Sequence, residues 1–207
     1  MKPFVSIRPV TREERALAAA FRPDAGDAKK QLGIERFLLG LTGSRLAQRF
    51  CFEPAINLNG LTGGYQGPGS KTVLPREARA KFDIRLVPDM TPEDVSRQLR
   101  RHLDRYGFPD VRIEDLHGYP AAKTAPDHPL VRLVVEAGTE AFGKPALARP
   151  TMAGSGPMHV FRRLMPCIGI GVGHGGARIH APNESIFVED LHRGIRHVIG
   201  VIERMKK

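Results

Sequence analysis

The segment 78–87 constrains the fold most strongly, because its apolar and charged residues alternate without a break. One face would carry Ala80, Phe82, Ile84 and Leu86, and the opposite face Arg79, Lys81, Asp83 and Arg85. A period of two is typical of a β-strand with one buried face. Thr91 follows as a helix N-cap, with Pro92 and two acidic residues in the first turn. We therefore predict a strand and then a helix that stops at Gly107.

Two neighbouring segments extend this strand and helix into a larger unit. Residues 55–59 and 111–114 both alternate like short strands. The glycine-rich stretch between 60 and 70 lacks the Gly-Lys-Ser/Thr ending of a phosphate loop, so we interpret it as a hairpin-type connection. The order strand–strand–helix–strand over residues 55–116 is most of a split βαβ layout.

Helical patterns lie on both sides of this unit. Thr11 and Glu14 form a capping box, and a second helical stretch runs from Leu32 to Phe50. After residue 129 the chain predicts a helix to Phe142, a turn at 151–157 with a short helix, a buried strand at 166–172 and a final helix. The final helix would bury Leu191, Ile195, Val198, Ile199 and Ile202. The fold class is α/β, with an α+β portion at residues 55–116.

Charge and composition exclude two classes of function. The chain has 207 residues and a formal charge of +10, but the excess is spread as six charges over residues 1–110 and four over 111–207. No block of like charge or aromatic–basic interleaving accompanies it, so nucleic-acid binding is disfavoured. No apolar run is long enough for a membrane helix. Cys51 and Cys167 make no disulfide framework, which favours a reduced, cytoplasmic protein with both thiols as small core residues.

The densest group of chemistry-bearing residues is the loop 173–184, which directly follows the predicted buried strand. Its imidazoles are suitable metal ligands, and Glu184 is placed to orient one of them. The alternative is a loop histidine bonded to backbone. The pairs Glu13-Glu14 and His102-x-Asp104 fall inside amphipathic helices, so we interpret them as helix surface.

Three single residues carry weaker signals. Ser155 follows Gly154 before a short helix and could be a nucleophile or an anion-binding hydroxyl; substrate binding suits it better, since no elbow motif or acid–histidine partner accompanies it. Arg85 lies on the charged face of its strand, where an arginine either clamps a carboxylate or is merely solvated. His128 precedes Pro129 and could simply start a helix.

Together, five ordered motifs resemble peptidase family M20, the aminoacylase/carboxypeptidase group of dinuclear metallohydrolases, in its carnosinase-like dipeptidase branch. The motifs are Gly67–Pro75, Lys81–Pro92, Pro9–Glu14, Gly154–Pro157 and His180–Glu184. The resemblance implies that residues 1–118 are part of a ferredoxin-like lid and dimerisation domain with a helical insertion. It implies that residues 119–207 are the C-terminal segment of the catalytic domain.

The resemblance also implies roles for single residues. His180 would be a metal ligand, Arg85 would bind the carboxylate of a dipeptide or N-acyl amino acid, and Thr72 would reach into the partner subunit's site of a homodimer. Ser155 and Gly154 would contact substrate near the scissile amide, with His128 close by. Two divalent ions, Zn or Mn, would activate the attacking water in the full-length family.

The family's remaining metal ligands and its general base have no counterpart in this sequence, since the family places them before the lid. A catalytic zinc needs about three protein ligands. We therefore expect a C-terminal portion of a dipeptidase that is inactive alone, with apolar faces left exposed. The alternatives are a non-catalytic dimerisation module or one half of a split enzyme.

Overall fold

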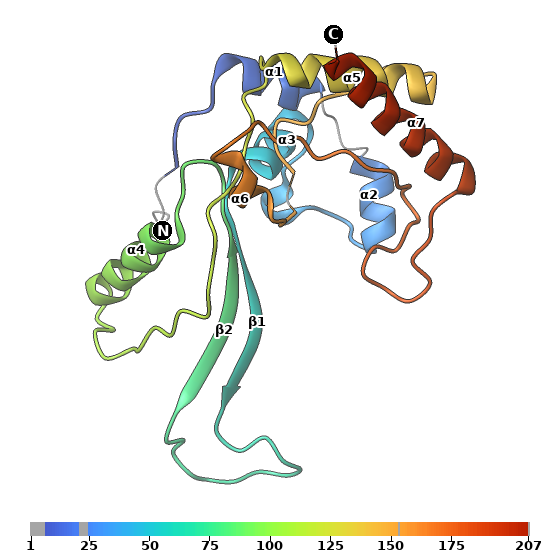
Figure 1. Cartoon of the computed structure of the whole chain (residues 1–207). Helices are drawn as coiled ribbons and strands as arrows, with labels where there is room; N and C mark the ends of the chain where they lie inside the picture. Colours follow the sequence, from blue (N-terminus) through green and yellow to red (C-terminus); the bar gives the residue numbers. More distant parts are fainter. Residues whose placement is uncertain (1–6, 21–24, 153, 207) are drawn as a thin grey trace. The chain divides into compact units, whose positions relative to one another are not determined.

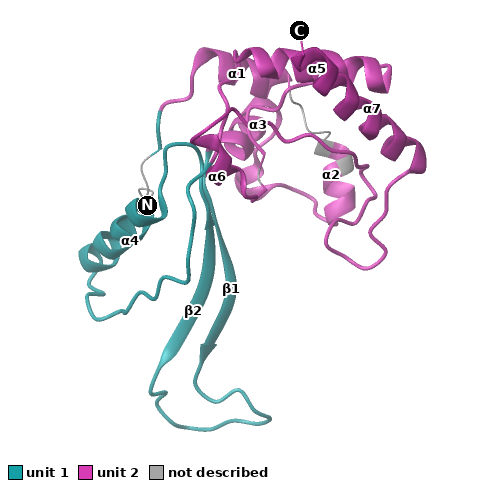
Figure 2. Cartoon of the chain, viewed as in Figure 1, with its two compact units in different colours: residues 1–8, 53–121 teal, residues 9–52, 122–207 magenta. Residues whose placement is uncertain are grey.

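The computed structural model describes residues 7–20, 25–152 and 154–206. The chain divides into two compact units (Figure 2). Unit 1 comprises residues 1–8 and 53–121, and unit 2 comprises 9–52 and 122–207. The junction at 121/122 lies near the predicted boundary at 118/119, but the N-terminal helices belong with unit 2. Assignment of the predicted domains to a lid and a catalytic part stays a prediction.

Unit 1 is built on a long antiparallel hairpin (Figure 1). Strand β1 runs from Ala55 to Gly63 and strand β2 from Ala78 to Arg85, both where the alternation predicts strands. Ala55 pairs with Arg85, and the register shifts at a β-bulge between Leu58 and Gly60. The apolar side chains of the hairpin remain largely open to solvent, with Leu58 65% and Phe82 41% exposed.

Helix α4, Pro92–Arg105, completes unit 1 and confirms the predicted cap. The Thr91 hydroxyl accepts a hydrogen bond from the backbone N–H of Asp94 at 3.1 Å. Arg100 on this helix donates to the carbonyl oxygens of Phe108, at 2.7 Å, and Val111. The guanidinium therefore holds the chain that returns from the C-terminus of the helix.

Two predicted strands, 111–114 and 166–172, are irregular in the structure. A strand needs a hydrogen-bonded neighbour, and residues 166–172, which were predicted to be buried, are exposed or half-buried. The sheet among the described residues contains β1 and β2 alone. Side chains form hydrogen bonds with backbone groups of these segments instead. Arg100 donates to the Val111 carbonyl. The Thr124 hydroxyl accepts from the N–H of Cys167 at 2.9 Å and donates to its carbonyl at 2.6 Å.

Unit 2 is helical. Its elements are α1 (Arg12–Ala20), α2 (Ala25–Leu32), the 3₁₀ turn η1 (Leu38–Gly40), α3 (Gly43–Phe52), α5 (Pro129–Phe142), α6 (Met158–Arg162) and α7 (Val188–Met205). Gly33 and Gly40, both at φ 64°, interrupt the single helix expected from Leu32 to Phe50. Ala18, Cys51 and Phe52 form a buried cluster between α1 and α3.

The capping box at the start of α1 is confirmed in both directions. The Thr11 N–H donates to Glu14 Oε2 at 2.9 Å, and the Glu14 N–H donates to Thr11 Oγ1 at 3.2 Å. Helix α5 has the predicted start and stop, with Gly143 at φ 63° as its left-handed cap.

Helices α5 and α7 pack through small and polar residues. His197 Nε2 donates to the Val134 carbonyl at 2.9 Å, and a Cβ placed on Gly138 would lie 3.1 Å from the His197 ring. The face of α7 that was predicted to be buried is open, with Leu191, Ile195, Val198, Ile199 and Ile202 between 45% and 52% exposed. That prediction is wrong for the described residues, because α5 covers a different face of the helix. None of the described helices is long and apolar enough to cross a membrane.

Candidate functional site

The loop 173–187 folds back on itself before α7. The Ala177 N–H donates to the His174 carbonyl, and the Ser185 N–H donates to the Ala177 carbonyl, each at 3.0 Å. Ala177 is 4% exposed and forms the buried point of the loop. The loop therefore has a defined backbone path, although its outer residues face solvent.

Three non-glycine residues of this loop adopt left-handed backbone conformations. They are Arg178 at φ 53°, His180 at φ 62° and Asn183 at φ 64°. Such conformations cost about 1–3 kcal/mol each and concentrate at functional sites. The His180 N–H donates to Glu184 Oε2 at 3.2 Å. Glu184 thus fixes the backbone of His180, and the His180 side chain is exposed on the loop.

His174 takes the alternative role of a loop histidine bonded to its surroundings. Its Nδ1 accepts from the Gly176 N–H at 3.2 Å, so the neutral ring carries its proton on Nε2. Nε2 lies 3.4 Å from the Ser185 hydroxyl oxygen, and the ring packs on Phe187 with centroids 4.4 Å apart. With both ring nitrogens engaged, His174 is held as a structural residue, and it is no base for Ser185 in this tautomer.

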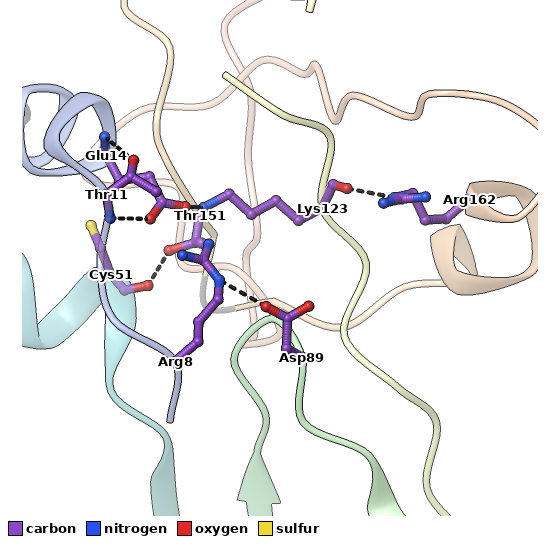
Figure 3. A network of polar contacts seen from close by, with 8 residues as sticks. All are labelled: Arg8, Thr11, Glu14, Cys51, Asp89, Lys123, Thr151 and Arg162. Carbon is purple, nitrogen blue, oxygen red and sulfur yellow. Dashed lines mark hydrogen bonds and ion pairs between the residues drawn. The ribbon is translucent and has the colours of Figure 1, made fainter. Parts of the chain in front are cut away.

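The turn that carries Gly154 and Ser155 is tethered at both ends within unit 2. Both residues are exposed. Before the turn, the Thr151 hydroxyl donates to the Cys51 carbonyl on α3; after it, Arg162 Nε donates to the Lys123 carbonyl at 2.6 Å (Figure 3). Pro157 is the N-cap residue of α6, so the turn leads directly into that helix.

A buried ion pair lies behind these tethers, and sequence reasoning missed it. Glu14 is 2% exposed, and its Oε1 bonds Lys123 Nζ, whose side chain is 12% exposed (Figure 3). The interpretation of Glu14 as ordinary helix surface is therefore wrong. No local pattern signals this contact, because 109 residues separate the partners.

The remaining predicted site residues have local contacts. His128 is the N-cap of α5, and its Nδ1 accepts from the Leu130 N–H at 3.1 Å. Arg85 Nε pairs with Asp83 Oδ2 at 3.1 Å on β2, and Thr72 is exposed in the connection between β1 and β2. Hydrogen bonds from Asn57 and Asn59, then the charge of Arg85, lower the pKa of Asp83.

The six residues thus divide between the units. Thr72 and Arg85 belong to unit 1, whereas His128, Gly154, Ser155 and His180 belong to three segments of unit 2. Among the residues that the structure describes, no group of three or more His, Cys, Asp or Glu side chains could hold a metal ion. His180 fits a single metal–imidazole bond, and the described residues do not build a dinuclear centre.

The two cysteines have structural surroundings. Both are free thiols, and burial raises the pKa of Cys51, which keeps it protonated and unreactive. Cys51 is a small core residue as predicted, whereas Cys167 is only half-buried.

Comparison with known proteins agrees with the motifs. The family model described as "Peptidase family M20/M25/M40" matches residues 6–204. The chain is 36% identical over 101 residues to the Beta-Ala-His dipeptidase of Rattus norvegicus, covering 49% of this chain and 20% of that protein. It is 27% identical over 181 residues to the Cys-Gly metallodipeptidase dug1 of Schizosaccharomyces pombe, covering 82% and 37%.

A solved structure extends the likeness to the fold. The M20 family metallo-carboxypeptidase Sso-CP2 from Sulfolobus solfataricus superposes with a TM-score of 0.82 and 32% identity, covering 95% of this chain and 46% of that one. The fold and the ordered motifs are those of a metallopeptidase. The chain belongs to peptidase family M20, and it spans less than half the length of each of these relatives.

Proposed function

We propose that this chain carries the lid portion and the C-terminal catalytic portion of an M20-type dipeptidase. The observation that carries the proposal is the family match over residues 6–204, combined with dipeptidase relatives that align with much of the chain. The substrate class is a dipeptide or similar N-acyl amino acid. A cytoplasmic location and a homodimer formed through the lid belong to the same proposal.

Each predicted site residue has a role in this proposal. Two divalent ions, Zn or Mn, would supply Lewis-acid activation of water when bound. His180 would contribute one ligand, held on a backbone that Glu184 fixes. The described residues supply no group of three ligands, so we derive no catalytic step through the metal.

Substrate binding falls to the other residues. Arg85 has the planar fork that binds a carboxylate bidentately, and it would exchange its pairing with Asp83 for the substrate. Thr72 would act across the dimer, and Ser155, Gly154 and His128 would line the position of the scissile amide.

Activity measurements test the proposal. The purified 207-residue chain should hydrolyse no dipeptide with added Zn or Mn. Hydrolysis should appear when the chain is combined with the part of the Sulfolobus metallo-carboxypeptidase that it does not cover. Appreciable metal-dependent hydrolysis by the chain alone would overturn the prediction that it is inactive. Failure of every combination to cleave any dipeptide would overturn the assignment of activity.

One histidine variant and a serine control test the ligand role. His180→Ala should abolish activity of the combined protein, whereas Ser185→Ala should leave it largely intact, because the Ser185 hydroxyl lies against the structural His174. Retained activity in His180→Ala would exclude His180 as a ligand.

A second candidate function is one half of a split enzyme or a non-catalytic dimerisation module. The exposed stripe of α7 favours it, since Leu191, Ile195, Val198 and Ile202 recur at spacings of four and three on one helix face. Such a stripe is typical of a helix that packs on a partner. Sedimentation of the wild type and of Ile195→Asp tests this second candidate. If the α7 stripe packs on a partner, the variant should lose the association that the wild type shows.

A further inference from the structure

Residues 122–124 connect four separate parts of unit 2, and we name them the hub segment. Lys123 Nζ bonds the buried Glu14 on α1 and lies 5.6 Å from the centre of the Phe52 ring on α3. The Lys123 carbonyl accepts from Arg162 on α6 at 2.6 Å, and the Thr124 hydroxyl bonds the backbone of Cys167. Each of these contacts joins residues at least 39 positions apart in the chain, the shortest being that to Arg162.

Helix α6 depends on such contacts for its position. It has five residues, and none of its side chains is buried. A helix this short is unstable by itself, because nucleation is costly and propagation over one turn recovers little. Its placement must come from contacts outside the helix, and the Arg162–Lys123 hydrogen bond is one that the structure shows (Figure 3).

The turn before α6 is held against the same cluster at its other end. Thr151 donates to the carbonyl of Cys51, the neighbour of Phe52 in the buried α1–α3 cluster. Residues 154–161, which include Ser155, therefore lie between two anchors on a core that Glu14 and Lys123 help to build. A buried, hydrogen-bonded ion pair requires a specific geometry. It therefore fixes the position of the hub segment in addition to burying it.

We propose that Glu14 and Lys123 are positioning residues for the turn that carries Ser155. The buried pair holds the hub segment on α1, and the Lys123 carbonyl then holds α6 through Arg162. This inference rests on the proposed function in one respect, which is that Ser155 contacts the substrate. The mechanical link itself concerns described contacts and is tested without activity.

Hydrogen exchange followed by mass spectrometry is the decisive measurement, because it reports local opening segment by segment. In the full chain, Glu14→Gln and Lys123→Met should each raise exchange of residues 154–164 by about tenfold or more, while the α5–α7 pair exchanges as in the wild type. Lys123→Arg should restore most of the protection, since it keeps the charge. Glu13→Gln is the matched control on the exposed side of α1 and should change nothing.

Arg162→Gln keeps the test decisive if the buried variants fail to fold. Arg162 is exposed, and this change removes the tether to the Lys123 carbonyl while leaving the ion pair intact. It should release residues 154–164 and leave residues 11–20 protected. Unchanged exchange at 154–164 in Arg162→Gln would overturn the proposal. So would a uniform rise across all of unit 2 in the folded Glu14 and Lys123 variants, which would mean a purely global stabilising role.

Discussion

The hairpin of unit 1 and the hub segment of unit 2 achieve order by opposite means. The hairpin pairs two strands that follow one another in the chain, through a ladder with one β-bulge, and it leaves its side chains largely in water. Its side-chain pair Asn57–Asp83 spans 26 residues. The hub segment joins residues 109 positions apart through a buried ion pair. Pairing of residues close in the chain has a small entropic cost of loop closure. Pairing of distant residues has a larger cost, which burial and specific contacts must offset. Unit 2 should therefore be the unit that single substitutions disrupt most.

The largest effect is expected from Lys123→Ala. It removes the ammonium group that pairs with the buried Glu14 carboxylate, so the free energy of unfolding should fall by about 3–5 kcal/mol. Urea unfolding followed by circular dichroism measures this. Glu13→Ala, one residue away and exposed, should stay within about 0.5 kcal/mol of the wild type. Equal losses in the two variants would remove the contrast between a buried pair and a helix surface.

A smaller effect is expected in unit 1 from Thr91→Ala. The variant loses the hydroxyl that accepts from the Asp94 N–H, which should cost about 1 kcal/mol. Thr91→Ser is the matched control and should retain nearly all of the stability, because it keeps the hydroxyl. The same urea titration applies, with hydrogen exchange of 92–97 as the local readout. If the alanine and serine variants are equally stable, the cap contributes nothing.

The smallest effect concerns the pH dependence of the hairpin. The pKa of Asp83 is lowered in the folded state, chiefly by hydrogen bonds from the two asparagines, so its contribution to stability is present above its ordinary pKa of 3.8. That contribution is lost as the pH falls below this value and through the folded-state pKa. Asp83→Asn should flatten the acid limb of a stability profile slightly. Wild-type and Asp83→Asn profiles with the same slope from about pH 5 down to about pH 2 would refute the linkage.

The sequence is a good guide where the determinants are local. The Thr91 cap, Gly143 at the end of α5 and the alternation of 78–87 each specify their element without help from distant residues. The predicted strands 111–114 and 166–172 are absent because a strand depends on a neighbour that periodicity does not reveal.

The candidate site follows the same division. The motif His180–Glu184 could be found from sequence, and the structure adds that the carboxylate holds the His180 backbone. Two features could not be predicted from the sequence. The roles of Glu14 and Lys123 depend on a pairing of residues 109 positions apart, and the exposure of the α7 stripe depends on which face of the helix α5 covers.

The open hairpin has a consequence for the behaviour of the chain in solution. Among the described residues the sheet has two strands, so each strand has one edge that pairs with no other strand there, and such an edge invites other strands to add. Strand β2 places Arg79, Lys81 and Arg85 along this hairpin, and the chain carries a formal charge of +10. Cations at such positions oppose edge-to-edge growth, because like-charged copies repel one another. High salt, which screens that repulsion, should shorten the lag before fibrillar assembly.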